Sequence, residues 1–566
     1  MTIPFSRHAL AIVASLCAGV CANVSAQTVP NIGDVLRQVP SPGAPIARPA
    51  PALPQVDNRT PIEPPMQALP DGGATVEVKD FVIVGNREIA APVLKALLAG
   101  DIGKSLTLAQ LEDAATKLTR YYRSQGYFVA RVYVPQQEVK AGVVVLRAVE
   151  GNYGKFILDN QSRVRDDIVQ GMLDDVKKYD IVSLDTLERA MLIINDTPGV
   201  QVIRADVMPG QAVGTSDFNV GTQATAEYEG YVLADNYGTK ATGPERISAN
   251  LDWNSPTRHG DRLSVSGLSS FNGDMLNARV GYSTVLSASG WRGEAAVSHT
   301  QYSLGDAYTA LDAQGRADSV ELGVSYPIRR IRAQTIQWGL NYAYKDMLDE
   351  VQSTNTSTPK IANTLSSNIL LRDEGLLWGL DGVTQATAAL TVGELDIQDA
   401  AARALDQAAA GAQTQGSYSY LNISLGRVSV LPNDFNLSAT LKSQRALGRN
   451  LDGSERMGLA GSGGVMAYPS GELSGSDADL VRLELSRSLP TWANVNSQWS
   501  VLVNWGQGRE TTLQNMRELS DVALGWVGKG SNGVLVKAYL AHRLGSPAVS
   551  ETDTVDRFLI QAGWVF

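Results

Sequence analysis

Residue types that usually carry catalysis or hold metals are sparse in this sequence. It has four histidines, and no two of them have the spacing of paired metal ligands. Both of its cysteines, Cys17 and Cys21, lie in an apolar stretch near the N-terminus, so we expect no disulfide framework or thiolate metal site in the rest of the chain. The motifs Gly-x-Ser-x-Gly and His-Glu-x-x-His and the complete phosphate-binding glycine loop are missing. The sequence therefore predicts neither an enzyme nor a protein with a metal or another cofactor.

Charge and hydropathy limit the class of protein further. The formal net charge is -10, whereas nucleic-acid-binding domains are basic, so no nucleic-acid partner is expected. Beyond the N-terminal stretch, no apolar run reaches the roughly 20 residues of a transmembrane helix. Only helices and closed barrels satisfy their backbone polar groups in lipid, so insertion into a membrane would require a closed sheet.

The first 26 residues are typical of a secretory signal peptide. A basic start at Arg7 precedes an apolar run over residues 9–20, and the small residues Ser25 and Ala26 offer a cleavage site. The apolar run is too short for a transmembrane anchor. We therefore expect residues 1–26 to direct export of the chain.

Two further segments precede the first compact region. Residues 27–40 contain a stretch, 31–39, that fits a two-turn helix. Such a helix is marginal alone in water, because isolated helices shorter than about 12 residues rarely persist. Residues 41–74 are dense in proline, as in PSPGAPIARPAPALPQ, and are expected to form an extended linker.

The next region alternates between strands and amphipathic helices. A helix is predicted over 107–124, where Thr107 and Gln110 form a capping box and apolar residues from Leu108 onward follow a helical period. A shorter copy of the same strand and helix scheme follows. We therefore expect two small α/β domains in tandem, at residues 75–152 and 153–212.

From residue 213 onward the pattern changes to apolar–polar alternation with a period of two. Segments of about ten residues, such as ARVGYSTVL and SQWSVLVNWGQ, fit tilted strands that cross a bilayer, and turns rich in Gly, Asn, Asp and Ser separate them. At roughly 20 residues per strand and connection, residues 213–566 predict a transmembrane β-barrel of about 16 antiparallel strands. A soluble β-sandwich array shares the alternation, but the signal peptide and the final aromatic residue, Phe566, favour a barrel.

Two sequence patterns carry a resemblance to a known family. The first is YYRSQGYFVARVYVPQQEVKAGVVVLRAVEG, which includes Tyr127, Pro135, Gln137 and Gly151. The second, LADNYGTKATGPERISANLDWNSPTRHGDRLSV, stands at the expected start of the barrel. Both resemble the two-partner secretion (TpsB-type) transporters of the outer membrane, that is, the haemolysin secretion/activation and filamentous haemagglutinin exporter family of the Omp85 superfamily. The two α/β domains are similar to its polypeptide-transport-associated (POTRA) domains.

A third resemblance lies in residues 454–480, which are similar to the loop that folds back into the barrel in this superfamily. The tip of this gating loop comprises Gly464, Val465, Met466, Ala467, Tyr468 and Pro469. Met466 stands where the family normally has an arginine, and Asn504 stands where the family has its aspartate partner on the barrel wall. Both ends of the usual ion pair are therefore neutral. We expect Met466 and Asn504 to face each other through packing and amide hydrogen bonding.

The resemblance implies protein transport. Such a transporter moves a large TpsA-like exoprotein, recognised through its N-terminal secretion domain, from the periplasm to the cell surface or medium without nucleotide hydrolysis. It implies a monomer that lies in the bacterial outer membrane in contact with lipids, with its POTRA domains in the periplasm. It also implies that the barrel-assembly machinery inserts the protein and recognises a signal at Phe566. The gating loop and the helix within 27–40, as a plug, would occupy the resting lumen.

Three other functions share some of these features. An Omp85-type insertase or assembly factor has the same fold, but the main assembly protein typically has more POTRA domains and keeps the arginine that Met466 replaces. A TonB-dependent receptor has a globular plug and more strands, whereas the region before the barrel here resembles tandem POTRA domains. An outer-membrane enzyme needs a catalytic constellation, and the sequence shows no such motif. The sequence does not identify the exported partner, which could be an adhesin, a cytolysin, a contact-dependent toxin or a haem-binding protein.

Overall fold

The computed structural model describes residues 29–39, 74–551 and 554–566. The expected signal peptide and nearly all of the expected proline-rich linker lie outside the described residues. Within the described ranges, no helix is both long enough and apolar enough to cross a membrane.

The first α/β domain contains a three-stranded sheet in the order β2-β5-β4. The capping box predicted for Thr107 and Gln110 is formed at the start of α4. The face of α4 that includes Leu118 and Tyr122 is fully buried, whereas Leu108 in its first turn is 50% exposed. The elements of the domain are β1 (Val76–Glu77), β2 (Asp80–Val84), α3 (Ala91–Leu97), β3 (Ser105–Leu106), α4 (Leu108–Ser124), β4 (Arg131–Tyr133) and β5 (Val143–Val149).

The second α/β domain repeats this arrangement with a sheet in the order β6-β8-β7. Its strand β8 corrects the expected boundary at residue 212, because β8 pairs with β6 and β7 and buries Phe218 and Val220 in the core of this domain. Its alternating sequence, TSDFNVGTQ, has the same period as the barrel strands, so the pattern alone assigned it to the barrel. The elements are β6 (Asn152–Gln161), α5 (Asp166–Asp174), α6 (Leu184–Asn195), β7 (Gln201–Pro209) and β8 (Thr215–Gln223).

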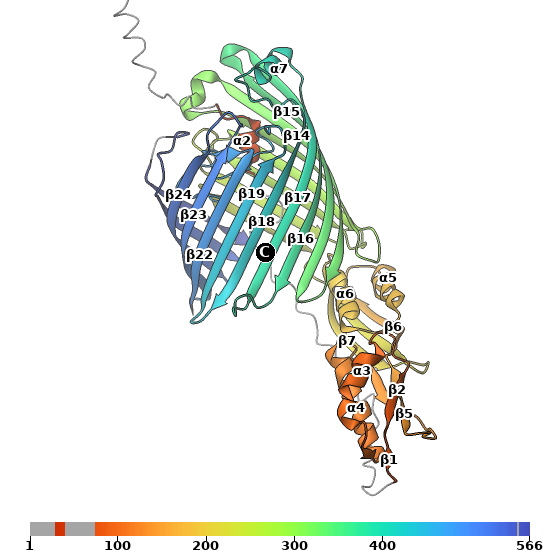
Figure 1. The fold of residues 1–566 in the computed structure, drawn as a ribbon. Coiled ribbons are helices and arrows are strands. Elements are labelled where there is room, and N and C mark those ends of the chain that lie inside the picture. Colours follow the sequence, from red (N-terminus) through yellow and green to blue (C-terminus); the bar gives the residue numbers. More distant parts are fainter. Residues whose placement is uncertain (1–28, 40–73, 552–553) are drawn as a thin grey trace, which may run out of the picture.

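Sixteen antiparallel strands form a closed barrel, which confirms the predicted fold class. The strands grow from 8 residues in β9 to 19 in β16, so the wall is taller on the side of β14–β17 (Figure 1). The strands are β9 (Tyr228–Asp235), β10 (Arg246–Asn254), β11 (Arg262–Ser270), β12 (Met275–Val285), β13 (Arg292–Ser303), β14 (Ala313–Arg330), β15 (Gln334–Val351), β16 (Thr356–Glu374), β17 (Gly382–Ile397), β18 (Gly416–Leu431), β19 (Phe435–Ala446), β22 (Asp477–Trp492), β23 (Val495–Arg509), β24 (Arg517–Gly530), β25 (Val534–Arg543) and β26 (Asp556–Val565).

The two α/β domains form an arm below one side of the barrel (Figure 1). Helix α6 contacts the end of β14, where the guanidinium of Arg189 donates to the carbonyl of Pro327 at 2.8 Å. The guanidinium of Arg330, the last residue of β14, forms an ion pair with the carboxylate of Asp196 at 2.7 Å. These contacts attach the arm to the rim of the barrel on this side.

Two segments lie inside the barrel. One is helix α2 (Ile32–Leu36), near the end of the barrel opposite the α/β arm (Figure 1). The other is the connection between β19 and β22, which folds inward as residues 450–476 and contains the short strands β20 (Met457–Gly458) and β21 (Ser474–Gly475). We refer to this connection as the in-folded segment. A further helix, α7 (Ala400–Asp406), lies in the β17–β18 connection.

Candidate functional site

The tip of the in-folded segment is a tight backbone turn. The Val465 amide donates to the carbonyl of Leu459 at 2.8 Å, and the Gly461 amide donates to the carbonyl of Val465 at 3.1 Å. A Cβ at Gly464 would lie 2.2 Å from the Leu459 carbonyl oxygen, so only glycine fits this position without a shift of the backbone. The turn presents the predicted tip, residues 464–469, as a compact buried unit.

Apolar side chains hold this tip against the barrel wall. Met466 is 3% exposed and Tyr468 is fully buried. They belong to one cluster with side chains that point inward from β22–β26, namely Leu480, Leu502, Leu519, Ala523, Ala541 and Leu559. Burial of an aliphatic side chain contributes about 1.5–3 kcal/mol, so this contact is a substantial part of what keeps the tip in place.

A row of polar side chains crosses the wall beneath the tip. Arg482, Asn504 and Asp521 are direct cross-strand neighbours on β22, β23 and β24. The Arg482 guanidinium donates to the Asn504 side-chain oxygen at 2.8 Å, and the Asn504 amide donates to the Asp521 carboxylate at 2.7 Å. The two residues at the ends of the row both bind the tip. Arg482 donates to the Gly464 carbonyl at 2.7 Å, and Asp521 accepts from the Ala467 amide at 2.6 Å.

This row corrects the expectation that amide hydrogen bonding joins Asn504 to Met466. The Asn504 amide instead connects Arg482 with Asp521, and both Asn504 and Asp521 are completely buried. The tip is therefore bound by charged groups, although neither Met466 nor Asn504 carries a charge. The carboxylate lies one strand further along the wall than the family pattern placed it.

The base of the in-folded segment has its own carboxylate anchor. The Glu472 side chain is completely buried and forms an ion pair with Arg517. It also accepts hydrogen bonds from the backbone amides of Val549 and Ser550, each at 2.9 Å, in the β25–β26 connection. The Tyr468 hydroxyl donates to the Ser546 carbonyl of the same connection at 2.8 Å. The segment is thus attached to the outer end of the wall as well as to its middle.

Helix α2 is bound to the lumen at both of its ends. Its N-cap, Asn31, forms a capping box with Asp34. The Ile32 amide donates to the carboxylate of Asp349 at 2.7 Å, and the carbonyl of Gln38 accepts from the guanidinium of Arg246 at 2.9 Å. A short helix that is marginal in isolation is thereby stabilised by the wall.

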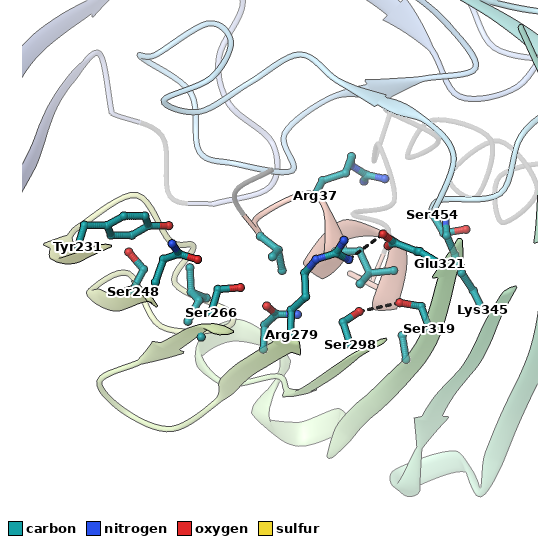
Figure 2. Close-up of a pocket in the computed structure, with 17 residues that line it drawn as sticks. Arg37, Tyr231, Ser248, Ser266, Arg279, Ser298, Ser319, Glu321, Lys345 and Ser454 are labelled. Atoms are coloured by element: carbon teal, nitrogen blue, oxygen red, sulfur yellow. Dashed lines mark hydrogen bonds and ion pairs between the residues drawn. The ribbon is translucent and has the colours of Figure 1, made fainter. Parts of the chain in front are cut away.

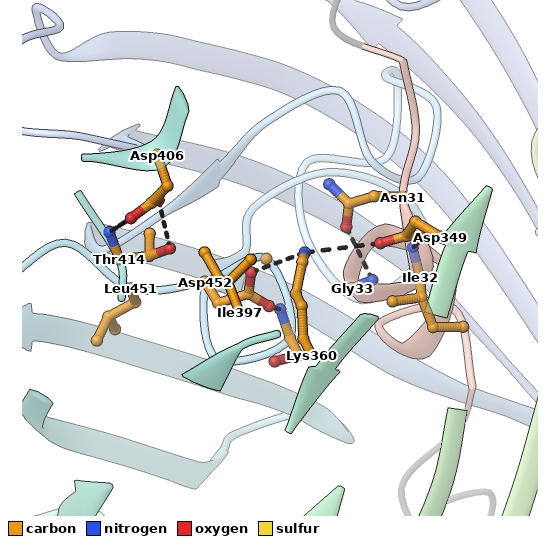
Figure 3. A network of polar contacts seen from close by, with 12 residues as sticks. Asn31, Ile32, Gly33, Asp349, Lys360, Ile397, Asp406, Thr414, Leu451 and Asp452 are labelled. Carbon is orange, nitrogen blue, oxygen red and sulfur yellow. Dashed lines mark hydrogen bonds and ion pairs between the residues drawn. The ribbon is translucent and has the colours of Figure 1, made fainter. Parts of the chain in front are cut away.

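Helix α2 also touches the in-folded segment directly. A Cβ on Gly33 would lie 2.3 Å from the carbonyl carbon of Gly453, so the two backbones are in close contact. Arg37 donates to the Gly453 carbonyl. Beside this contact, the Lys360 ammonium lies 3.6 Å from Asp349 and 3.1 Å from Asp452 (Figure 3). One lysine therefore joins the carboxylate that holds α2 to the carboxylate at the start of the in-folded segment.

The pattern residues of the first POTRA-like domain have structural surroundings. The Gln137 side chain accepts from the Val145 amide at 2.7 Å and donates to its carbonyl at 2.8 Å, so it extends the pairing of β5 beyond β4. The Pro135 carbonyl also accepts from Gln137, at 3.3 Å. The Tyr127 hydroxyl donates to Glu88 at 3.1 Å, and burial together with this carboxylate raises the pKa of Tyr127 to about 12.

Two further predicted residues lie at junctions. Gly151 has a φ of +84°, and a Cβ there would lie 2.5 Å from a methyl group of Val129, so glycine is required between the two α/β domains. The backbone of Phe566 exchanges hydrogen bonds of 2.9 and 3.0 Å with Gly230 of β9. Phe566 therefore extends the seam between β26 and β9 that closes the barrel. In the described parts of the chain, no group of three or more His, Cys, Asp or Glu residues could hold a metal ion.

Comparison with known families agrees with this architecture. The family model "Haemolysin secretion/activation protein ShlB/FhaC/HecB" matches residues 214–528, and the model "POTRA domain, ShlB-type" matches residues 76–151. The first of these matches covers more than half of the chain. The chain therefore belongs to the haemolysin secretion/activation protein family ShlB/FhaC/HecB.

Individual relatives and solved structures extend this result. The chain is 26% identical over 427 residues to the heme/hemopexin transporter protein HuxB of Haemophilus influenzae, and the aligned region covers 75% of this chain and 74% of HuxB. It is 27% identical over 156 residues to the outer membrane transporter CdiB of Dickeya dadantii, and this alignment covers 28% of this chain and 27% of CdiB. The structure of CdiB from Escherichia coli shares the fold, with a TM-score of 0.73 at 17% identity over 89% of this chain and 93% of CdiB.

Family and fold together define the function. The chain is an outer-membrane transporter of the two-partner secretion (TpsB) type with periplasmic POTRA domains. It moves a TpsA-like exoprotein from the periplasm across the outer membrane.

Proposed function

We propose that the sixteen-stranded barrel is the passage for a large exoprotein, that the POTRA domains capture its N-terminal secretion domain, and that α2 and the in-folded segment close the passage at rest. The observation that carries this proposal is the state of the lumen, in which two segments far apart in sequence are bound side by side. Carboxylates tether both of them, the largely buried Asp349 for α2 and the fully buried Asp521 for the in-folded segment.

The POTRA domains offer surfaces that suit an extended segment of the exoprotein. Strand β4 is the last strand of its sheet, and an added strand can bind such an edge through main-chain hydrogen bonds. Next to β4, a cavity of about 650 Å³ separates Arg131 and Tyr133 from the β7–β8 turn around Val213. Apolar side chains of the captured segment would fit this cavity, while its backbone pairs with β4.

The other partners follow from the barrel surface. Side chains such as Val265 and Val297 are about half exposed on its outer face, where membrane lipids would cover them. We propose that the protein acts as a monomer, that the barrel-assembly machinery inserts it through the terminal Phe566, and that it neither binds nucleic acid nor catalyses a reaction. Since HuxB is a heme/hemopexin transporter, a haem- or hemopexin-binding exoprotein is the first cargo to test.

Closure by α2 is tested by conductance in planar bilayers. Deletion of residues 29–39 should raise the frequency of open-pore events, because it removes the helix from the lumen. The matched control deletes eleven residues of the proline-rich stretch 41–74 and should leave the frequency unchanged. An unchanged frequency in the first variant would exclude α2 from the closure.

Export itself is tested in cells. Loss of this chain should remove one large exoprotein from the cell surface or medium while other outer-membrane barrels assemble normally. A general loss of barrel proteins would instead identify an insertase.

A further inference from the structure

The inner wall of the barrel is divided into two sectors with different contents. On the side of β19–β26, the in-folded segment packs against the wall through its tip. On the side of β9–β15, a cavity of about 280 Å³ remains between the wall and α2. We call the lining of this cavity the polar sector, and Figure 2 shows how its side chains surround the space below α2. The short polar residues that the wall contributes are Ser248, Asn250, Ser266, Asn277, Ser298 and Ser319.

The polar sector offers many weak and interchangeable hydrogen bonds. Cross-strand pairing aligns Asn250, Ser266, Arg279, Ser298 and Ser319 in a single row around the wall. Hydroxyl and amide side chains both donate and accept hydrogen bonds, so they can bond to either backbone group of a polypeptide. The cation of the row, Arg279, is neutralised by Glu321 at 2.7 Å (Figure 2). Such a wall can replace the water around a peptide backbone without holding any one segment tightly.

The polar sector lies directly above the attachment of the POTRA arm. Arg189 of α6 donates to the Pro327 carbonyl near the end of β14 and, at 3.3 Å, to the Ser289 carbonyl in the β12–β13 turn. The end of β14 and the β12–β13 turn belong to the periplasmic rim of this sector (Figure 1). Toward the other end of the barrel, where α2 lies, Leu36 and Val39 line the cavity. A chain released by the POTRA arm therefore meets this sector first and α2 last.

We infer that the exported polypeptide passes in extended form along the polar sector, while the sector of β19–β26 remains covered by the in-folded segment. This inference rests on the proposed export function. It assigns the contact surface for the moving chain to one side of the lumen.

Site-specific crosslinking on the full-length transporter tests the inference. Ser266→Cys and Ser298→Cys place a thiol in the polar sector. Thr440→Cys places one in the other sector, because Thr440 pairs with the inward-facing Arg482. Val265→Cys is the matched outer control, since Val265 is 46% exposed on the outer face. Each thiol carries a benzophenone, and the probe is a tagged peptide of about 20 Gly, Ser and Asn residues, which spans about 66 Å when extended.

Three outcomes separate the alternatives. The inference predicts about tenfold more labelled peptide at positions 266 and 298 than at 440, which corresponds to about 1.4 kcal/mol of preference. Equal or stronger labelling at 440 would overturn the inference and leave passage through the barrel intact. If labelling at positions 266, 298 and 440 does not exceed the level at the outer position 265, the proposed function itself is contradicted.

Discussion

Replacement of Asp521 by asparagine tests how the tip of the in-folded segment is held. Asp521 is completely buried, and its two carboxylate oxygens accept one hydrogen bond each, from the Ala467 amide at 2.6 Å and from the Asn504 amide at 2.7 Å. An asparagine side chain has one acceptor oxygen and one amino group. The Asp521→Asn variant must therefore turn its amino group toward one of these two donors.

The expected cost follows from this geometry. One buried donor loses its partner, which costs about 1–3 kcal/mol, and the remaining hydrogen bond changes from a charged acceptor to a neutral one, which costs about 1 kcal/mol more. The variant no longer buries a charge at position 521, which lowers this cost. The nearby Arg482 guanidinium loses its counter-charge, which raises the cost again. We expect the tip to be held less tightly by about 3 kcal/mol, which is roughly a hundredfold in its opening equilibrium.

Hydrogen exchange of a peptide that covers residues 459–470 measures this opening. Its amides should exchange roughly a hundredfold faster in Asp521→Asn than in the wild type, whereas peptides of the POTRA domains should not change. Glu518→Gln is the matched control, because Glu518 lies on the same strand with its side chain exposed. Exchange within about twofold of the wild type, a difference below about 0.5 kcal/mol, would refute the role of Asp521.

Three further changes probe the other contacts. Lys360→Met leaves two largely buried carboxylates without their cation, so we expect a loss of about 3–5 kcal/mol, seen as a lower melting temperature and more frequent open-pore events. Arg189→Met keeps the apolar stem but loses the hydrogen bonds to the barrel rim, which contribute about 1.5–3 kcal/mol to the attachment of the arm. Limited proteolysis should therefore cleave the variant faster between the arm and the barrel, and unchanged cleavage would show that Arg189 does not hold the arm. Cysteines at Met466 and Asn504 are expected to form a crosslink, and a folded barrel that cannot form it would show that these two positions do not face each other.

The barrel and the POTRA domains could be predicted because their information is local. A period of two over about ten residues defines a membrane strand wherever it occurs, and the Thr107–Gln110 capping box defines the start of α4. The same locality explains the misplaced boundary at β8. Alternation around Phe218 identifies a strand but not the sheet to which the strand belongs.

The contacts of the tip could not be predicted, because they depend on how a loop aligns with three strands. A usable signal was nevertheless present in the strands themselves. In VRLELS the apolar side chains Val481, Leu483 and Leu485 share the outer face, which places Arg482 in the lumen. The same alternation around Val522 places Asp521 in the lumen. Two opposite charges on nearby strands of one inner wall indicate a polar anchor, and the family pattern drew attention to Asn504 instead.

The energetics of α2 distinguish it from the in-folded segment as the removable closure. Two of its side chains, Ile32 and Val35, are fully buried, which contributes about 3–6 kcal/mol. The hydrogen bonds to Asp349, Gly453 and Arg246 add about 1.5–3 kcal/mol each, or about 4.5–9 kcal/mol together. Ordering residues 31–38, which make these contacts, costs about 8–16 kcal/mol of backbone entropy, so the two totals nearly cancel. The in-folded segment instead buries a whole apolar cluster and the Glu472 carboxylate. An arriving polypeptide that competes for the polar sector therefore needs to contribute only a few kcal/mol to displace α2.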